Sequence, residues 1–500
     1  MTGPSLSKGD QSPARPPAFT ERQKLIALAL LASTQFVIVL DAAIVNVALP
    51  SIGKDLDFSQ DNLAWVVNAY TLTFGGFLLL GGRIADLLGR RRLFIGGLSL
   101  FALASLFGGL ATSETQLTIA RAIQGLGAAL IAPAALSMVT NMFSEGSERN
   151  KALGVWGAVS GSGGAAGVLL GGVLTEYLGW EWVFWVNVPI GVGAAILAPR
   201  LLRESRRESE TRTFDALGAI TVTAGLSLLV FALVDANRAG WESTQTLGLL
   251  AASAMLIAVF VAVELRSSAP LVPFKIFSNR TLTGANVTGL FTGAALFAMF
   301  FFLSLYMQQV LGYDALKAGL SYLPLALSII VSAGVASQLV TRFGFKPVLV
   351  LGLAMVAVAL VWLGQVPVDG GYASHLLAPM VLAAVGLGFA FVPMTIAAVS
   401  GVSEGDSGLA SGLINTFQQV GGALGLAVLA AIANSRTSDL AEAAQGDPQA
   451  LPSALTEGFQ AAFLAGSGIA VLGIVAALTL IHSSDSRAIV GAKPAELPVA

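Results

Sequence analysis

The chain has 500 residues, of which 55% are hydrophobic and only 11% are charged, and its formal net charge is −2. Soluble domains carry about 25% charged residues, so a chain this apolar favours the lipid bilayer as its solvent. The near-neutral charge argues against a nucleic-acid partner. With no cysteine, and with its two histidines (His375 and His482) far apart in sequence, the chain offers no disulfide and no zinc site.

Residues 1–21 are polar and rich in proline, which predicts a disordered tail and no cleavable signal peptide. Beyond them, fourteen stretches are long and apolar enough to cross a bilayer as helices of about 20 residues. They are residues 25–49, 62–82, 93–113, 117–142, 152–177, 183–202, 215–235, 246–265, 282–310, 316–340, 347–365, 376–399, 408–432 and 459–481. The sequence therefore predicts an all-α polytopic membrane protein with 14 transmembrane helices and a second tail at 483–500.

Basic residues are distributed unevenly among the connections between these segments. With the N-terminus inside the cell, 22 of the 27 lysines and arginines fall on the inner side, four fall on the outer side and Arg121 lies within a helix. Inner connections of membrane proteins carry the excess of lysine and arginine. The bias predicts that both termini are cytoplasmic, in the plasma membrane, and that the number of helices is even.

Three short sequence similarities relate the first six segments to the last six. Residues 85–98 resemble 340–353, residues 125–130 (GLGAAL) resemble 386–391 (GLGFAF), and the glycine-rich stretch 152–177 resembles 408–432. Their consistent order predicts a six-helix half at 22–205, two additional helices within 206–270 and a second six-helix half at 271–482. Transporters built from such repeats hold their substrate between the halves, near the middle of the membrane.

Asp41 and Arg121 are ionisable residues inside predicted helices. A charge at membrane depth is costly unless it is paired or faces water, so such residues indicate function by default. We expect Asp41 to carry a proton and Arg121 to need an acceptor from helix 1 or from its own neighbourhood. The alternatives are an aspartate that lines a wet vestibule and an arginine that only anchors helices together.

The segment from Gly82 to Phe94 joins a carboxylate, Asp86, to a glycine turn at Gly89 and to the arginines that begin at Arg90. Asp86 can pair with an arginine of the turn or with the N-terminus of a neighbouring helix, where the helix dipole favours an anion. In a protein that alternates between two states, that pairing would latch one of them. The alternative is ordinary positive charge on the inner side, which requires neither the carboxylate nor the glycine.

Glycines recur every four positions in two of the predicted helices. They are Gly157 and Gly161, and Gly163, Gly167 and Gly171, in the fifth helix, and Gly408 and Gly412, and Gly421 and Gly425, in the thirteenth. This spacing lets two backbones approach closely, and we expect it to pack the two halves together, with simple static packing as the alternative.

Aromatic and charged residues near the ends of the later helices give weaker indications. Trp180, Trp182 and Trp185 cluster at the outer start of the sixth helix, where interfacial anchoring is expected. The second half shows no clear deep charge, so it could offer a largely apolar wall to a substrate.

With these motifs, the chain resembles the major facilitator superfamily and, more narrowly, its fourteen-helix drug:proton antiporter branch, over about residues 22–482. The match covers the cytoplasmic signature from Gly82 to Arg92, the helix 4 signature from Leu117 to Ala129, and the signatures of helices 1 and 6. The residues that carry these last two are Asp41, Asn46, Ala48, Leu49 and Pro50, and Trp180, Trp182, Phe184, Asn187, Pro189 and Gly191.

The resemblance implies two six-helix halves plus two extra helices that work by alternating access. It implies that Asp41 and Arg121 couple transport to protons. It also implies a gating network, which consists of Asp86, Arg90, Gly82 and Gly89.

The sequence therefore predicts a secondary transporter, not an enzyme, that exports small lipophilic molecules in exchange for protons. Asn46, Gln124 and Gln35 are the polar candidates for lining the substrate cavity. The alternative is proton-linked or facilitated transport of a lipid or an endogenous metabolite. No cofactor or metal is expected, and a monomer suffices.

Overall fold

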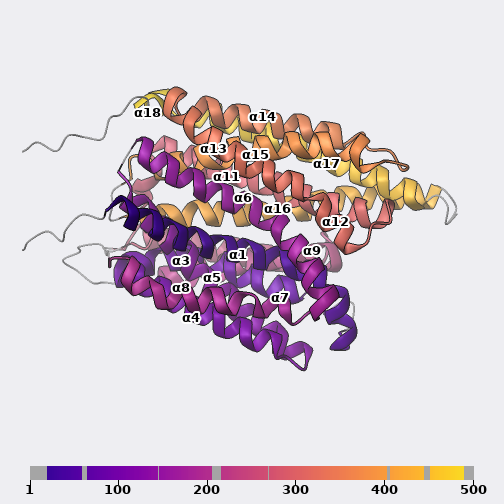
Figure 1. The fold of residues 1–500 in the computed structure, drawn as a ribbon, viewed down its shortest axis with the longest axis horizontal. Helices are drawn as coiled ribbons and strands as arrows, with labels where there is room; N and C mark the ends of the chain where they lie inside the picture. The colour runs from indigo at the N-terminus through magenta and orange to yellow at the C-terminus, as the bar shows by residue number, and fades with distance from the viewer. Residues whose placement is uncertain are drawn as a thin grey trace, which may run out of the picture.

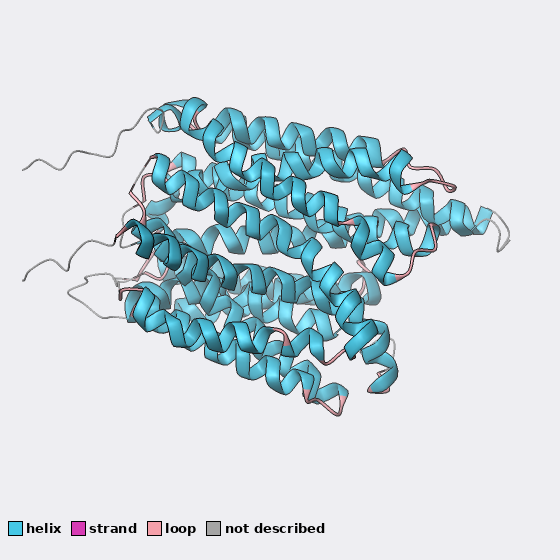
Figure 2. Ribbon diagram, in the orientation of Figure 1, coloured by secondary structure: helices cyan, strands magenta, loops and turns pink. Residues whose placement is uncertain are grey.

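The computed structural model describes residues 20–58, 63, 65–144, 146–204, 215–267, 270–402, 406–443 and 451–488. Within these ranges the chain is helical, with short connections and no β-strand (Figure 2). Thirteen described helical segments are long and apolar enough to cross a membrane. The seventh expected segment, 215–235, coincides with α9, whose apolar stretch Leu217–Leu233 is shorter. The prediction of an all-α polytopic membrane protein is confirmed.

In the part of the chain that the structure describes, the N-terminal half is a bundle of seven helices. It consists of α1 (Glu21–Asp55), α3 (Trp65–Leu88), α4 (Arg90–Gly109), α5 (Glu114–Met142), α6 (Ser147–Leu178), α7 (Trp182–Trp185) and α8 (Asn187–Leu201). α1 packs along α6, and α5 packs along both α3 and α4. Hydroxyl side chains begin two of these helices, because the Thr20 and Ser113 oxygens accept from the otherwise unpaired N–H groups of Gln23 and Gln116.

Two additional helices, α9 (Ala216–Ala239) and α10 (Thr244–Glu264), follow the N-terminal half. They pack against each other, and α9 also packs against α3 and against α16 (Ser407–Ala443) of the other half. α9 therefore lies along the seam between the halves, and α10 packs against it. The predicted start of this insertion at 206 lies outside the described residues, and its predicted end at 270 falls in the connection before η1 (Phe274–Ser278).

The C-terminal half is a second bundle, in which α11 packs along α16 and α14 packs along α15. It consists of α11 (Arg280–Leu305), η2 (Tyr306–Val310), α12 (Ala315–Ser321), α13 (Leu323–Phe343), α14 (Phe345–Leu363), η3 (Tyr372–Leu376), α15 (Leu377–Val399), α16 and α17 (Leu451–Leu480), followed by the short α18 (Ser483–Ala488).

Two expected helices are interrupted in the structure. The segment 183–202 is divided at Val186 into α7 and α8, and the segment 316–340 is divided at Tyr322 into α12 and α13. Pro324 follows the second interruption, in the first turn of α13, where a missing N–H costs no hydrogen bond.

The two halves meet through equivalent pairs of helices. α3 packs against α16, and α6 packs against α13. The sequence similarities relate the second helix to the tenth and the fifth to the thirteenth, so these two contacts correspond to each other under the predicted repeat. α16 also contacts α5, and α6 also contacts α12 and α15, across this interface.

α1 begins and α18 ends at the same end of the bundle, where the indigo and yellow ends of the chain meet the same face (Figure 1). The helix ends at this end of the bundle carry arginines. They are Arg90 at the start of α4, Arg149 at the start of α6 and Arg342 at the end of α13. We call this end of the molecule the basic end.

Candidate functional site

A buried ion pair joins Asp41 of α1 to Arg121 of α5. Arg121 Nη1 donates to Asp41 Oδ2 at 2.6 Å, and both side chains are 0% exposed. The expectation that helix 1 or the neighbourhood of Arg121 itself supplies its acceptor is confirmed, with Asp41 as the acceptor from helix 1. The alternative of an aspartate that lines a wet vestibule does not hold in this structure, because Asp41 is sealed from solvent.

Arg121 is held by three helices at once. Its Nε donates to the Val66 carbonyl of α3 at 2.8 Å. Its guanidinium carbon lies 4.4 Å from the centre of the Tyr70 ring and 5.8 Å from that of Phe184, and aromatic faces attract cations. These contacts fix the cation beside Asp41, as an ion pair removed from water requires.

Gln124 lies inside this network and is 0% exposed, and its contact with a substrate stays a prediction. Its Oε1 accepts from Arg121 Nη1 at 2.9 Å. Its Nε2 donates to Asp41 Oδ1 at 3.2 Å and to Ser105 Oγ at 2.7 Å. The amide therefore links α4, α5 and α1.

Asn187, the first residue of α8, completes the network. Its Nδ2 donates to Asp41 Oδ1 at 2.7 Å, and the side chain is 0% exposed. Asn187 was not among the predicted site residues, and its position in the helix 6 signature was the one signal that could have found it. We call Asp41, Arg121, Gln124, Ser105 and Asn187 the carboxylate cluster.

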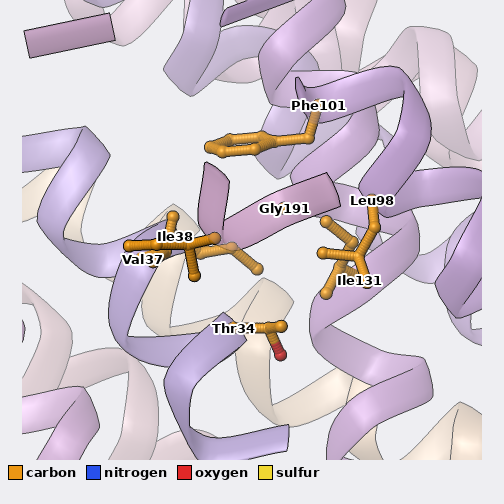
Figure 3. Close-up of a pocket in the computed structure, with 8 residues that line it drawn as sticks. Thr34, Val37, Ile38, Leu98, Phe101, Ile131 and Gly191 are labelled. Carbon is orange, nitrogen blue, oxygen red and sulfur yellow. The ribbon is translucent and has the colours of Figure 1, made fainter. Parts of the chain in front are cut away.

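A small apolar cavity lies about one turn from the carboxylate cluster, toward the basic end. It is lined by Thr34, Val37, Ile38, Leu98, Phe101, Ile131, Ile190 and Gly191. Figure 3 shows these side chains as hydrocarbon except for the Thr34 hydroxyl, which donates to the Leu31 carbonyl. α1, α4, α5 and α8 thus form both the polar cluster and an apolar layer beneath it.

A second network crosses the interface between the halves at the basic end. Asp86 Oδ1 accepts from the Gly408 N–H at 3.2 Å, and Asp86 Oδ2 accepts from the Leu409 N–H at 3.1 Å, both in the first turn of α16. Arg90 Nη2 donates to Asp86 Oδ1 at 2.8 Å. Both partners considered for Asp86, an arginine of the turn and a helix N-terminus, are therefore present together.

The two glycines of this segment meet different requirements. A Cβ at Gly82 would lie 2.6 Å from the Gly408 carbonyl oxygen, so only glycine lets α3 approach α16 this closely. Gly89 joins α3 to α4 with φ of +109°, a conformation that favours glycine.

Further hydrogen bonds join the halves at the basic end. Ser137 of α5 bonds Ser407 of α16 at 2.7 Å. Asn150 of α6 donates from Nδ2 to Thr341 Oγ1 at 3.1 Å, and its backbone carbonyl accepts from Ser337 Oγ at 2.7 Å. Together with Asp86, these contacts close the halves against each other at this end.

Five of the predicted packing glycines lie within the halves, which corrects for them the expectation that they join the halves. Gly163, Gly167 and Gly171 face α1, and Gly421 and Gly425 face α11. The other four predicted glycines do join the halves, since Gly157 faces Val392, Gly161 faces Ile329, and Gly408 and Gly412 of α16 face α3. Sequence spacing shows that a helix has a small face but not which neighbour that face meets.

The remaining polar candidates lie elsewhere on α1. Gln35 Nε2 lies 3.5 Å from Ser160 Oγ of α6. Asn46 is exposed, and its Nδ2 donates to the carbonyl of Ala42 in its own helix at 3.2 Å. Contact of either side chain with a substrate stays a prediction. The described residues contain no group of three or more metal-ligating side chains.

The C-terminal half agrees with the expectation of no deep charge, since none of its described Asp, Glu, Lys or Arg side chains is buried. Its interior is less apolar than expected, because α11 and α16 bury several neutral polar side chains. These are Asn286, Thr288 and Thr292 on α11 and Ser411 and Thr416 on α16.

The tryptophans of the sixth segment differ from one another. Trp182 is 41% exposed, as an interfacial anchor would be. Trp180 is 3% exposed, and its Nε1 donates to Asp55 Oδ2 at 3.1 Å, so it belongs to the core. Interfacial anchoring is therefore the wrong assignment for Trp180.

Comparison with known proteins places the chain among transporters. The Major Facilitator Superfamily model matches residues 31–426. The cephamycin export protein CmcT of Amycolatopsis lactamdurans is 43% identical over 82% of this chain and 85% of its own length. The puromycin resistance protein pur8 of Streptomyces alboniger is 38% identical over 92% of each chain. The solved structure of the proton:xylose symporter XylE aligns with a TM-score of 0.64 at 13% identity, over 93% of this chain and 97% of its own, which shows the fold alone.

Proposed function

Because the chain belongs to the Major Facilitator Superfamily, a family of membrane transporters and not of enzymes, we propose that it exports small lipophilic, drug-like or antibiotic molecules in exchange for protons. The substrate class and the direction rest on the relatives, which are named for cephamycin export and for puromycin resistance. The proposal that transport is coupled to protons rests on one observation. This observation is the buried Asp41–Arg121 pair in the membrane-spanning part of the N-terminal half.

Proton uptake by Asp41 would change how α1 is held. In the described state, Asp41 accepts from Arg121, Gln124 and Asn187, all of which stabilise its ionised form. Protonation removes one charge of the pair and leaves Arg121 without its counter-ion in the core. The packing of α1 against α5 and α8 would then depend on whether the proton is bound.

Alternation between two states requires that the contacts at the basic end break. Asp86 with α16, Ser137 with Ser407 and Asn150 with Thr341 all join the halves there. In this proposal the basic end is the cytoplasmic end, both termini lie in the cytoplasm, the membrane is the plasma membrane, and one chain is sufficient. A substrate and a proton that each favour a different state would drive exchange.

The test is efflux from a bacterial host that lacks its major pumps. The probes are ethidium, puromycin and a cephamycin, and each is measured with and without a protonophore. Wild type is compared with Asp41→Asn and with the control Asp439→Asn, which changes an exposed aspartate near the end of α16.

We expect wild type and Asp439→Asn to export at least one probe, the protonophore to stop it, and Asp41→Asn to fail at normal membrane levels. Export by Asp41→Asn at the wild-type rate would refute its role in coupling. Export of none of the probes by wild type would refute the substrate class, and lipids and endogenous metabolites would be tested next.

A further inference from the structure

Asn187 occupies an unusual position for a neutral side chain. It is the first residue of α8, directly after the interruption at Val186, and α8 packs against both α1 and α4. This arrangement brings its amide to Asp41 Oδ1 at 2.7 Å, shorter than the 3.2 Å from Gln124 to the same oxygen.

The other end of the Asn187 amide is unpaired. Its Oδ1 is buried and has no hydrogen-bond partner in the described part of the chain. A buried acceptor without a donor carries a free-energy cost, so a side chain that keeps one calls for an explanation. The oxygen lies on the same amide group that already contacts Asp41.

A protonated Asp41 needs an acceptor that the ionised form does not. Arg121 has no acceptor atom, and Gln124 Oε1 is already engaged by Arg121 Nη1 at 2.9 Å. Among the side chains that bond Asp41 in the described structure, Asn187 Oδ1 is therefore the acceptor left free. A half-turn of the amide about its terminal bond would exchange the Nδ2 donor for this oxygen.

We propose that Asn187 is a positioning residue for the proton carrier, whose amide donates to ionised Asp41 and turns over to accept from protonated Asp41. This inference rests on the proposed function, since it assumes that Asp41 takes up the proton. One neutral group then satisfies both protonation states, so that the proton can bind and leave without unfolding the cluster.

Within the described residues, few other charges face Asp41. The charged or titratable neighbours are Arg121 of α5 and Tyr70 of α3, whose ring contacts the Arg121 guanidinium. The other helices packed nearby contribute neutral residues to this region, which are Ser105 of α4, Gly167 of α6, Phe184 of α7 and Asn187 of α8. The effect of removing the Asn187 amide on Asp41 should therefore be measurable with little contribution from other ionisable groups.

The test follows the Asp41 proton directly, in the purified full-length protein, and needs no substrate. The carboxylic acid C=O band of Asp41 is identified in infrared difference spectra by its loss in Asp41→Asn, and its pH midpoint is then measured. Asn187→Leu removes donor and acceptor at similar size, whereas Asn187→Ser keeps both. Asn286→Leu is the matched control, because Asn286 is also 0% exposed with an unpaired amide oxygen but lies in the other half.

We expect Asn187→Leu to change the pH dependence of the band, because the charge-assisted bond to ionised Asp41 and the neutral bond from the protonated acid are both lost and differ in strength. Its C=O band should also move to the frequency of an acid without an acceptor. Asn187→Ser should restore both properties, and Asn286→Leu should match wild type. If Asn187→Leu does not reach the membrane, Asn187→Ala takes its place.

An unchanged midpoint and frequency in Asn187→Leu or Asn187→Ala would overturn the role of Asn187. That outcome is separate from a failure of the proposed function, which would appear as normal efflux by Asp41→Asn in the transport assay.

Discussion

The Asp86 carboxylate of α3 accepts a hydrogen bond from the Leu409 N–H at the start of α16, which belongs to the other half of the protein. The two residues are 323 positions apart in sequence. Asp86 also accepts from Arg90, so one carboxylate connects a positively charged turn to a positive helix end. The contact exists only while the halves are closed at the basic end.

Asp86→Asn should favour opening of the basic end, because an amide of the same size lacks the charge that strengthens both contacts. Loss of a charge-assisted interaction of about 2 kcal/mol would shift the equilibrium between the two states by roughly thirtyfold. The chain has no cysteine, so spin labels can be placed at Leu88→Cys and Phe343→Cys, two exposed positions at the ends of α3 and α13. The label-to-label distance distribution should move to longer values.

Asp439→Asn is the control for that measurement, since it removes an exposed carboxylate at the opposite end of α16. A distance distribution that is the same in Asp86→Asn and in wild type would show that Asp86 does not latch the closed state.

The buried pair of Asp41 and Arg121 predicts a non-additive stability series. Arg121→Met leaves an uncompensated carboxylate in the core, which should cost about 3–5 kcal/mol. Adding Asp41→Asn removes that charge, so the double variant should be more stable than Arg121→Met alone. Thermal unfolding of the purified proteins in detergent measures both. A double variant that unfolds at a lower temperature than Arg121→Met would contradict this account.

The close approach of α6 to α1 predicts that Gly167 tolerates no side chain. A Cβ there would lie 2.7 Å from the Leu40 carbonyl oxygen and 2.9 Å from Ala43 Cβ, so backbone would have to move. We expect Gly167→Ala to destabilise the protein by about 1–3 kcal/mol. Gly248→Ala in α10, where nothing lies within 4 Å of the new Cβ, should be neutral or slightly stabilising. Equal melting temperatures for the two variants would refute the packing assignment.

The connection after α10 depends on a buried carboxylate. Glu264 is 4% exposed, and its two oxygens accept from the N–H groups of Leu271 at 3.1 Å and Val272 at 3.2 Å. Glu264→Gln places an NH₂ group against one of these donors, so the connection should loosen. Trypsin should then cleave faster at the exposed Arg266, by about tenfold for a loss of about 1.4 kcal/mol.

Glu242→Gln serves as the control for the proteolysis, because Glu242 is exposed in the connection before α10. Equal cleavage rates at Arg266 in Glu264→Gln and in wild type would mean that the carboxylate does not hold the connection.

Hydropathy along the chain was sufficient to predict the class of protein and the positions of its helices. Each spanning segment must by itself be long and apolar enough to cross the bilayer, so its own sequence reveals it. The same logic identified Asp41, Arg121 and Asp86, since a charge among apolar residues is visible without knowing its partner. Hydropathy could not predict the helix interruptions at Val186 and Tyr322, because a short interruption hardly changes the mean hydropathy of the segment that contains it.

The partners of these residues were decided by the tertiary structure alone. Asp41 and Arg121 are 80 positions apart, and Asn187 is 146 positions from Asp41. Burying a neutral amide in an apolar helix costs less free energy than burying a charge, so Asn187 does not stand out in the sequence. Its contact with Asp41 becomes visible only in the structure, where α8 packs against α1. For the same reason the glycine spacing of α6 was visible beforehand, whereas the helix that it faces was not. Local composition determines which segments enter the membrane, and only packing determines which of their faces meet.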